Sequence, residues 1–242
     1  MVRGRGQLWG RGRFWRLVKA RIRAEQAAIK LRKQTAMTLF SDSDRQQISA
    51  AITAAERNTS GEIMAVVAQA SENYYYVPFL WAALAALLIP WPLIHFTWIT
   101  VQWIYLVQLL VFLALLIVLW PRARRTALVP RSLRNAHVDR RAAEQFLTLN
   151  LHTTAGRTGV LIFVSVAERH AVILADKEIN ARVPGGTWQT IVDDLTRELG
   201  AGNPAPAFMR AIEKVGQHLA QHFPPGSIDT NELPDRLIVL DT

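Results

Sequence analysis

The chain has 242 residues, a net charge of +9 and no cysteine. This length allows one or two domains, and the lack of cysteine excludes a fold held by disulfides and a thiolate nucleophile. The basic residues are spread unevenly along the chain, and their distribution indicates which parts meet a membrane.

Residues 1–38 form a basic segment with eleven Lys and Arg residues and a single acidic residue, Glu25. Gly and Arg dominate residues 1–13, which predicts disorder, and the apolar spacing over residues 14–38 predicts an amphipathic helix lying on anionic lipid headgroups. Nucleic acid is a less favoured partner for the same segment. An organelle transit peptide is a further alternative, whereas a secretory signal peptide is not expected because the segment has no uninterrupted apolar core.

The first part of a folded domain is expected over residues 39–72. A helix should begin at the "SDSD" stretch, with Ser43 and Gln46 forming a capping box, and end at the "NTSG" turn. The next residues, 62–69, alternate in the manner of an amphipathic strand. Glu62, the first residue of this strand, is expected to be exposed or paired.

Residues 73–121 contain no Asp, Glu, Lys or Arg. About 20 apolar residues are enough for one helix to cross a bilayer, so this stretch predicts two transmembrane helices joined as a hairpin. We expect the helices over about residues 77–93 and 101–120. Pro90 and Pro92 should disrupt the end of the first helix near a membrane face. The chain is therefore expected to be an integral membrane protein.

Positive charges flank the hairpin on both sides, and the turn between its helices carries none. Seven Lys or Arg residues lie within residues 121–141, and the part over residues 122–136 is expected to be a basic juxtamembrane linker. Because cytoplasmic loops carry an excess of Lys and Arg, both termini should face the cytoplasm.

The second part of the domain is expected over residues 137–223. The apolar run at 159–166 predicts a strand buried on both faces, and 170–175 predicts another, joined to the first by a turn short enough for an antiparallel hairpin. A helix is expected near 139–152. The order of strand, helix and strand predicts parallel pairing between 62–69 and 159–166, with the membrane hairpin inserted in the crossover.

Two amphipathic helices should follow, with Trp188 and Phe208 on their apolar faces, and Pro224 should end the second. Residues 224–242 are expected to be a C-terminal tail, with a short edge strand at "DRLIVLD" as the alternative. These elements predict the α/β fold class with a small mixed sheet, interrupted by a two-helix transmembrane hairpin.

Two stretches carry a resemblance to a known family. The patterns "E-x-x-T-x-G-E-I" at residues 56–63 and "G-V-L-I-F-V-S" at 159–165, together with the Trp188 and Phe208 helices, resemble the TPM domain family. The resemblance covers roughly residues 39–223 apart from the spans, and looks closest to a bacterial branch whose TPM domain is split by a membrane hairpin and faces the cytoplasm. It implies a compact α/β/α sandwich in a multi-pass protein of the bacterial inner (plasma) membrane.

The resemblance implies more than one kind of function. Some members are credited with acid phosphatase activity, some bind divalent metal through acidic residues, and others are assembly or repair factors. Bacterial relatives are often encoded beside a small helical membrane protein, which implies a membrane protein partner. We expect a non-enzymatic interaction or assembly module at the membrane, without an assigned catalytic residue. The alternative is a metal-dependent, acid-phosphatase-like hydrolase of phosphomonoesters.

Acidic residues at helix starts and strand ends are the candidates for a metal site. Asp176 directly follows a predicted strand, where α/β folds often place ligands, although a turn residue is the simpler interpretation. For the other four candidates, which lie in the first halves of predicted helices, capping and favourable interaction with the helix dipole are the simpler roles. The expected cofactor is a divalent cation, Ca²⁺ or Mg²⁺, held by oxygens of Asp42, Asp44, Asp176, Asp193 and Asp194. His218 and His222 are an alternative pair for Zn²⁺, without an evident third ligand.

Overall fold

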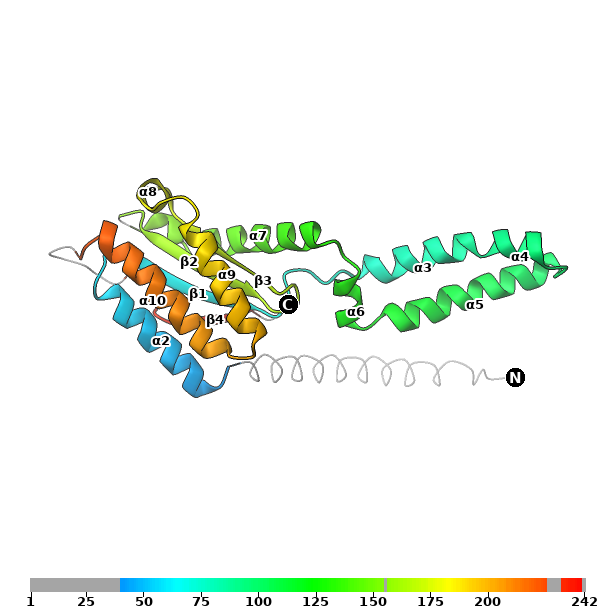
Figure 1. The fold of residues 1–242 in the computed structure, drawn as a ribbon, viewed down its shortest axis with the longest axis horizontal. Coiled ribbons are helices and arrows are strands. Elements are labelled where there is room, and N and C mark those ends of the chain that lie inside the picture. The colour runs from blue at the N-terminus through cyan, green and yellow to red at the C-terminus, as the bar shows by residue number, and fades with distance from the viewer. Residues whose placement is uncertain (1–39, 155, 226–231, 241–242) are drawn as a thin grey trace, which may run out of the picture.

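The computed structural model describes residues 40–154, 156–225 and 232–240. The predictions made for residues 1–38 lie outside these ranges. Within them, the chain forms an α/β sandwich from which an apolar helical hairpin projects (Figure 1).

A four-stranded sheet forms the centre of the sandwich, in the strand order β3, β2, β1, β4. The strands are β1 (Glu62–Ala68), β2 (Gly159–Ser165), β3 (His170–Ala175) and β4 (Leu237–Leu240). β1 pairs in parallel with β2 and with β4, and β2 pairs antiparallel with β3. The predicted parallel pairing of β1 with β2 is confirmed, and the C-terminal segment forms the edge strand that was the alternative to a tail.

β1 is buried along its whole length, so the prediction of an amphipathic strand is wrong. It lies between β2 and β4, and both faces of the sheet are covered. Alternate side chains enter two separate cores, the first with Ile63, Ala65 and Val67 and the second with Met64, Val66 and Ala68.

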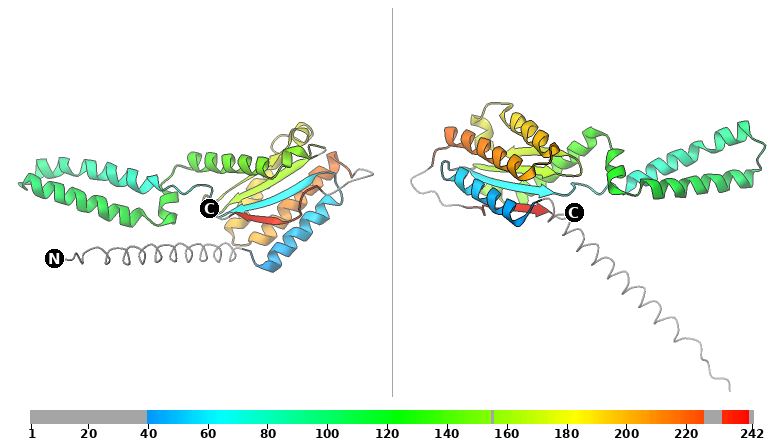
Figure 2. Two further views of the ribbon diagram at one scale, coloured as in Figure 1. Left: turned by 180° about the vertical axis from the view of Figure 1, so that it is seen from behind. Right: turned by 60° about the horizontal axis from the view of Figure 1, so that its bottom comes forward.

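Helices cover both faces of the sheet, as the two views in Figure 2 show. The larger core lies under α2 (Asp42–Glu56), α8 (Lys177–Arg182), α9 (Thr187–Gly200) and α10 (Pro204–His222). The opposite core lies under α7 (Arg131–Thr148), which leads into the short 3-10 helix η1 (Leu151–Thr153). This arrangement is the α/β sandwich with a mixed sheet that the resemblance implies.

The capping box of α2 lies two residues earlier than the sequence suggests. The Asp44 N–H donates to Ser41 Oγ over 3.1 Å, and the Ser41 N–H donates to Asp44 Oδ2 over 2.8 Å. The prediction of a box between Ser43 and Gln46 is therefore wrong. An Asp at the third helical position replaces the usual Glu or Gln, so the sequence pattern of a capping box points to Ser43 and Gln46 instead.

The apolar hairpin consists of α3 (Tyr76–Leu88), α4 (Pro90–Phe96) and α5 (Val101–Leu119). The spans Tyr76–Phe96 and Val101–Leu119 are long and apolar enough to cross a membrane, by length and composition. Pro90 occupies a first-turn position of α4, and Ile89 keeps a helical conformation, so the prolines interrupt the first span without ending it.

The segment expected as a basic linker is mostly helical. Residues 122–136 contain α6 (Arg122–Ala127) and the first turns of α7, which begins at Arg131. The hairpin thus returns to the sandwich through two helices. At this junction the rings of Tyr74 and His137 meet edge to face, with centroids 5.7 Å apart, so the chain leaves and re-enters the domain at neighbouring points.

Candidate functional site

Two hollows on the sandwich differ in the chemistry of their walls. One of about 700 Å³ lies between α2 and α10, and small or amide side chains form most of its wall, with Glu213 as its carboxylate. The other, of about 320 Å³, lies where β1 begins and is lined by three carboxylates, Glu56, Glu62 and Asp235. These three residues, called here the carboxylate cluster, make the second hollow the better candidate for a functional site.

Three separate parts of the chain build the carboxylate cluster. Glu56 is the last residue of α2, Glu62 is the first residue of β1, and Asp235 lies two residues before β4. The parallel pairing of β4 with β1 brings Asp235 to the same end of the sheet as Glu62. The site therefore exists only when the C-terminal strand has joined the sheet.

Hydrogen bonds hold these carboxylates in place. Oε1 of Glu56 accepts from the Ile63 N–H over 2.7 Å, and Oε1 of Glu62 accepts from the Glu232 N–H over 3.1 Å. The Thr53 hydroxyl donates to Asp235 Oδ2 over 2.6 Å. Each side chain is thus fixed by backbone or hydroxyl donors, and no Lys or Arg ion pair is involved in these contacts.

Burial and mutual repulsion keep a proton in the cluster. Burial, together with the negative charges of Asp235 and Glu62, raises the pKa of Glu56 to about 8, although its bond from Ile63 acts in the opposite direction. Burial also raises the pKa of Glu62, which is only 8% exposed. Of the two predicted states of Glu62, exposed or paired, the exposed one is therefore wrong: the carboxyl is buried and accepts a hydrogen bond from the Glu232 N–H. At neutral pH the Glu56 side chain is a carboxylic acid able to donate a hydrogen bond.

The described residues do not form a ready metal site. Throughout residues 40–154, 156–225 and 232–240, no group of three or more His, Asp or Glu side chains is arranged to hold a metal ion. Asp176 is the buried N-cap of α8: its Oδ1 accepts from the Lys177 N–H over 2.6 Å, while its Oδ2 has no partner among these residues. Because β3 runs antiparallel, Asp176 lies beside Gly159 at the start of β2, away from the carboxyl ends of the parallel strands.

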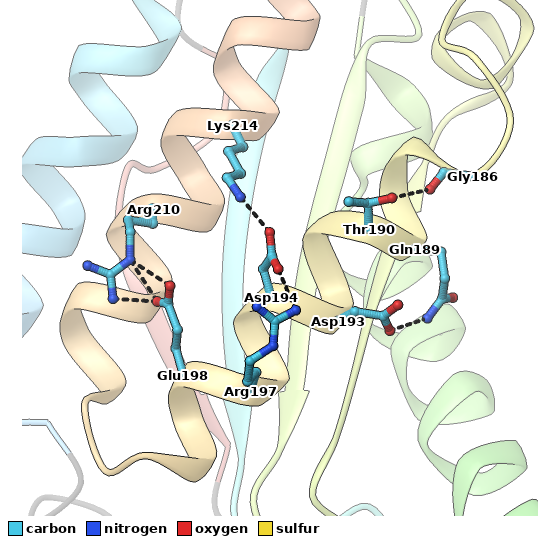
Figure 3. A network of polar contacts seen from close by, with 9 residues as sticks. All are labelled: Gly186, Gln189, Thr190, Asp193, Asp194, Arg197, Glu198, Arg210 and Lys214. Atoms are coloured by element: carbon cyan, nitrogen blue, oxygen red, sulfur yellow. Dashed lines mark hydrogen bonds and ion pairs between the residues drawn. The ribbon is translucent and has the colours of Figure 1, made fainter.

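The other predicted metal ligands take part in local structure. Figure 3 shows Asp194 between Lys214 and Arg197, which contact it at 2.6 and 2.7 Å. The hydrogen bond and charge of Lys214, with a contribution from Arg197, hold the pKa of Asp194 below its usual range. Asp193 accepts from Gln189 over 2.8 Å. The contacts from Lys214 link α9 to α10 and leave Asp194 engaged with cations of the chain itself.

The remaining candidates lie apart from one another. Asp42 is exposed in the first turn of α2, and Asp44 completes the capping box of that helix. His218 packs edge to face on Trp188 with ring centroids 6.4 Å apart, and the backbone carbonyl of His222 accepts from Arg182. Metal binding by the five aspartates, or by the histidines, remains a prediction.

The sequence contains a signal for two members of the carboxylate cluster. Glu56 and Glu62 are the two acidic positions of the "E-x-x-T-x-G-E-I" pattern, which by itself predicts a helix end followed by a strand. Asp235 precedes the "RLIVL" stretch, whose pairing with β1 could not be derived from periodicity. Two acids six residues apart at a helix end and a strand start were the available clue.

Comparisons with known proteins agree with the fold. The family model described as the TPM domain matches residues 125–218, from α6 into α10, so the chain carries a TPM domain there. Among solved structures, the chain is similar to the NMR structure of the BA42 protein from the psychrophilic bacterium Bizionia argentinensis, at 24% identity and a TM-score of 0.53, covering 83% of this chain and 94% of that one. At this identity the likeness shows the fold alone. No curated protein sequence matches the chain.

Proposed function

We propose that this chain, which carries a TPM domain over residues 125–218, is a multi-pass protein of the bacterial inner membrane. Its sandwich faces the cytoplasm and serves as a non-enzymatic interaction or assembly module for a membrane protein partner. The proposal rests on one observation, which is that an apolar hairpin with outward-facing side chains is built into the crossover between β1 and β2.

The exposure of the hairpin supports a place in lipid. The core helix of a soluble protein is mostly buried. In the most apolar 18 residues of α5, by contrast, only 6% is buried, and in the corresponding stretch of the first span, Tyr76–Phe96, only 22% is buried. Leu87, Phe96 and Ile117 are each more than two thirds exposed, at 71%, 79% and 75%. A continuous apolar surface of this kind is unstable in water and stable among acyl chains.

The insertion point explains why the domain would act at the membrane surface. The hairpin leaves after β1 and returns through α6 and α7, both ends meeting at Tyr74 and His137. The sandwich has no long linker on either side of the hairpin. Any partner bound by the sandwich is therefore held close to the bilayer.

Reporter fusions test this topology. A reporter fused after Thr242 and one inserted before Phe40 should both give a cytoplasmic signal, because positive charges flank the hairpin on both sides. A third, inserted at Trp98 between α4 and α5, should give the opposite signal and serves as the matched control. Signals on opposite sides from the first two positions would contradict the split-domain arrangement.

A metal-dependent phosphomonoester hydrolase is the second candidate, because the carboxylate cluster contains an acid that is protonated at neutral pH. Purified chain is expected to show no turnover of a generic phosphomonoester, with or without Ca²⁺ or Mg²⁺. Turnover that is lost in Glu56→Gln or Asp176→Asn, and retained in the control Glu213→Gln at an exposed position of α10, would contradict the non-enzymatic proposal.

A further inference from the structure

Arg125 is a buried cation at the base of the hairpin. It belongs to α6, just beyond the charge-free stretch, and is only 7% exposed. Its Nε and Nη1 are shielded from water and have no hydrogen-bond partner within the described part of the chain. An unpaired donor on a charged group costs more free energy than a neutral one, so the folded chain would gain stability from an anion at this position.

One aromatic side chain already contacts the guanidinium group. The Arg125 Cζ atom lies 4.4 Å from the centroid of the Tyr75 ring, and Tyr75 is itself 47% exposed. A cation–π contact stabilises the charge through the face of the group. The N–H groups point outward in the plane of the guanidinium and are not satisfied by the ring.

The surroundings place Arg125 where phospholipid phosphates would lie. The neighbouring Arg124 donates from Nη1 to the Val118 carbonyl, at the end of α5, over 2.5 Å. Phe79 and Trp120 pack edge to face near the same end of the hairpin, with ring centroids 6.4 Å apart. Tyr and Trp side chains gather at the level of lipid headgroups, so this end of the hairpin has the features of an interface.

We infer that Arg125, with Tyr75 stacked on it, binds the phosphate of an anionic phospholipid in the cytoplasmic leaflet. The inference rests on the proposed membrane location of the hairpin and adds a specific ligand to it. A guanidinium group matches phosphate oxygens in charge and in donor geometry, and the cytoplasmic leaflet is rich in anionic lipid. A soluble phosphate offers the same oxygens but has no acyl chains to hold it at this depth. Tyr75, being half-exposed, would tilt to admit the headgroup while its ring keeps the contact with the guanidinium group.

Thermal unfolding of the full chain in a neutral detergent tests the site. Added phosphatidylglycerol should raise the unfolding midpoint by about 5 °C, because a ligand that binds only the folded state stabilises it. Phosphatidylcholine and inorganic phosphate should each have little effect. Arg125→Gln should abolish the shift, and Arg125→Lys should reduce it because lysine offers a point charge without the planar group.

Arg140→Gln is the matched control for loss of one positive charge, since the Arg140 side chain is 80% exposed on α7. This variant should keep the full shift. An equal loss in Arg140→Gln, or no shift in the unmodified chain, would overturn the inference. A shift of the same size with inorganic phosphate would assign the site to a soluble ligand and overturn the lipid assignment.

If Arg125→Gln fails to fold, mass spectrometry of lipid retained by Tyr75→Leu replaces it. This variant should retain at least about tenfold less phosphatidylglycerol than the unmodified chain, and unchanged retention would overturn the inference. Recovery of the unmodified chain from cells without detergent would instead refute the membrane location. Failure of the lipid site and failure of the proposed membrane location would therefore give different results.

Discussion

Removal of residues 75–130, with Tyr74 joined to Arg131 through about eight Gly and Ser residues, is expected to convert the chain into a soluble, folded sandwich. The hairpin contributes no strand to the sheet, and the two cores on the faces of the sheet contain none of its residues. The excised chain should stay in the supernatant after membranes are sedimented, whereas the full chain should be found in the membrane pellet.

The junction geometry makes this excision feasible. Tyr74 and His137 are in ring contact, and α7 begins six residues before His137, which corresponds to about 9 Å of helix. A flexible linker of the stated length spans such a gap without strain. The loss is confined to the small cluster of Tyr74, Val77 and Val129, which packs at the base of the hairpin.

A substitution in the sheet of the excised chain tests whether that chain is folded as well as soluble. Val66→Asp in the excised chain buries a charge in β1, where Val66 is fully buried, and should cost more than about 4 kcal/mol and abolish cooperative unfolding. Far-ultraviolet circular dichroism during heating would measure this. The topology would be contradicted if the excised chain still sediments with membranes, or if its unfolding resembles that of the Val66→Asp variant.

Much of the fold could be predicted because apolar periodicity and charge are local signals. The run from Val160 to Val166 identified a buried strand, and the charge-free stretch identified the hairpin; both agree with the structure. The pairing of β4 with β1 was left open, because a four-residue strand with one buried position carries almost no pattern. Its place depends on a tertiary contact, namely the open edge of β1.

The candidate site was harder to predict than the fold. Asp176 was singled out because it follows a strand, but that strand is antiparallel, and this puts it at the opposite end of the sheet from the one expected. Glu56 is the first residue of the "E-x-x-T-x-G-E-I" pattern and the last residue of α2. Its raised pKa depends on burial and on Asp235, about 180 residues away, and neither can be read from neighbouring residues.

The pH dependence of stability should reveal the proton held by Glu56. The pKa of its carboxyl is raised from 4.5 to about 8 in the folded chain. Below the lower value both states are protonated; between the two values only the folded state keeps the proton, so stability falls as pH rises, and the loss is complete above about pH 8. Burial also raises the pKa of Glu62, which adds a loss of the same sign.

Glu56→Gln should remove the Glu56 part of this dependence. Glutamine keeps the Oε1 acceptor for the Ile63 N–H and carries no charge, so the variant resembles the protonated acid. Between pH 5 and pH 9 the unmodified chain should lose on the order of 2 kcal/mol more stability than the variant, after allowance for the partial exposure of Glu56. Denaturant unfolding of the full chain in neutral detergent at several pH values measures the difference.

Glu213→Gln, at an exposed position of α10 outside the cluster, should follow the unmodified chain. Parallel curves for Glu56→Gln and the unmodified chain would mean that the cluster does not retain its proton.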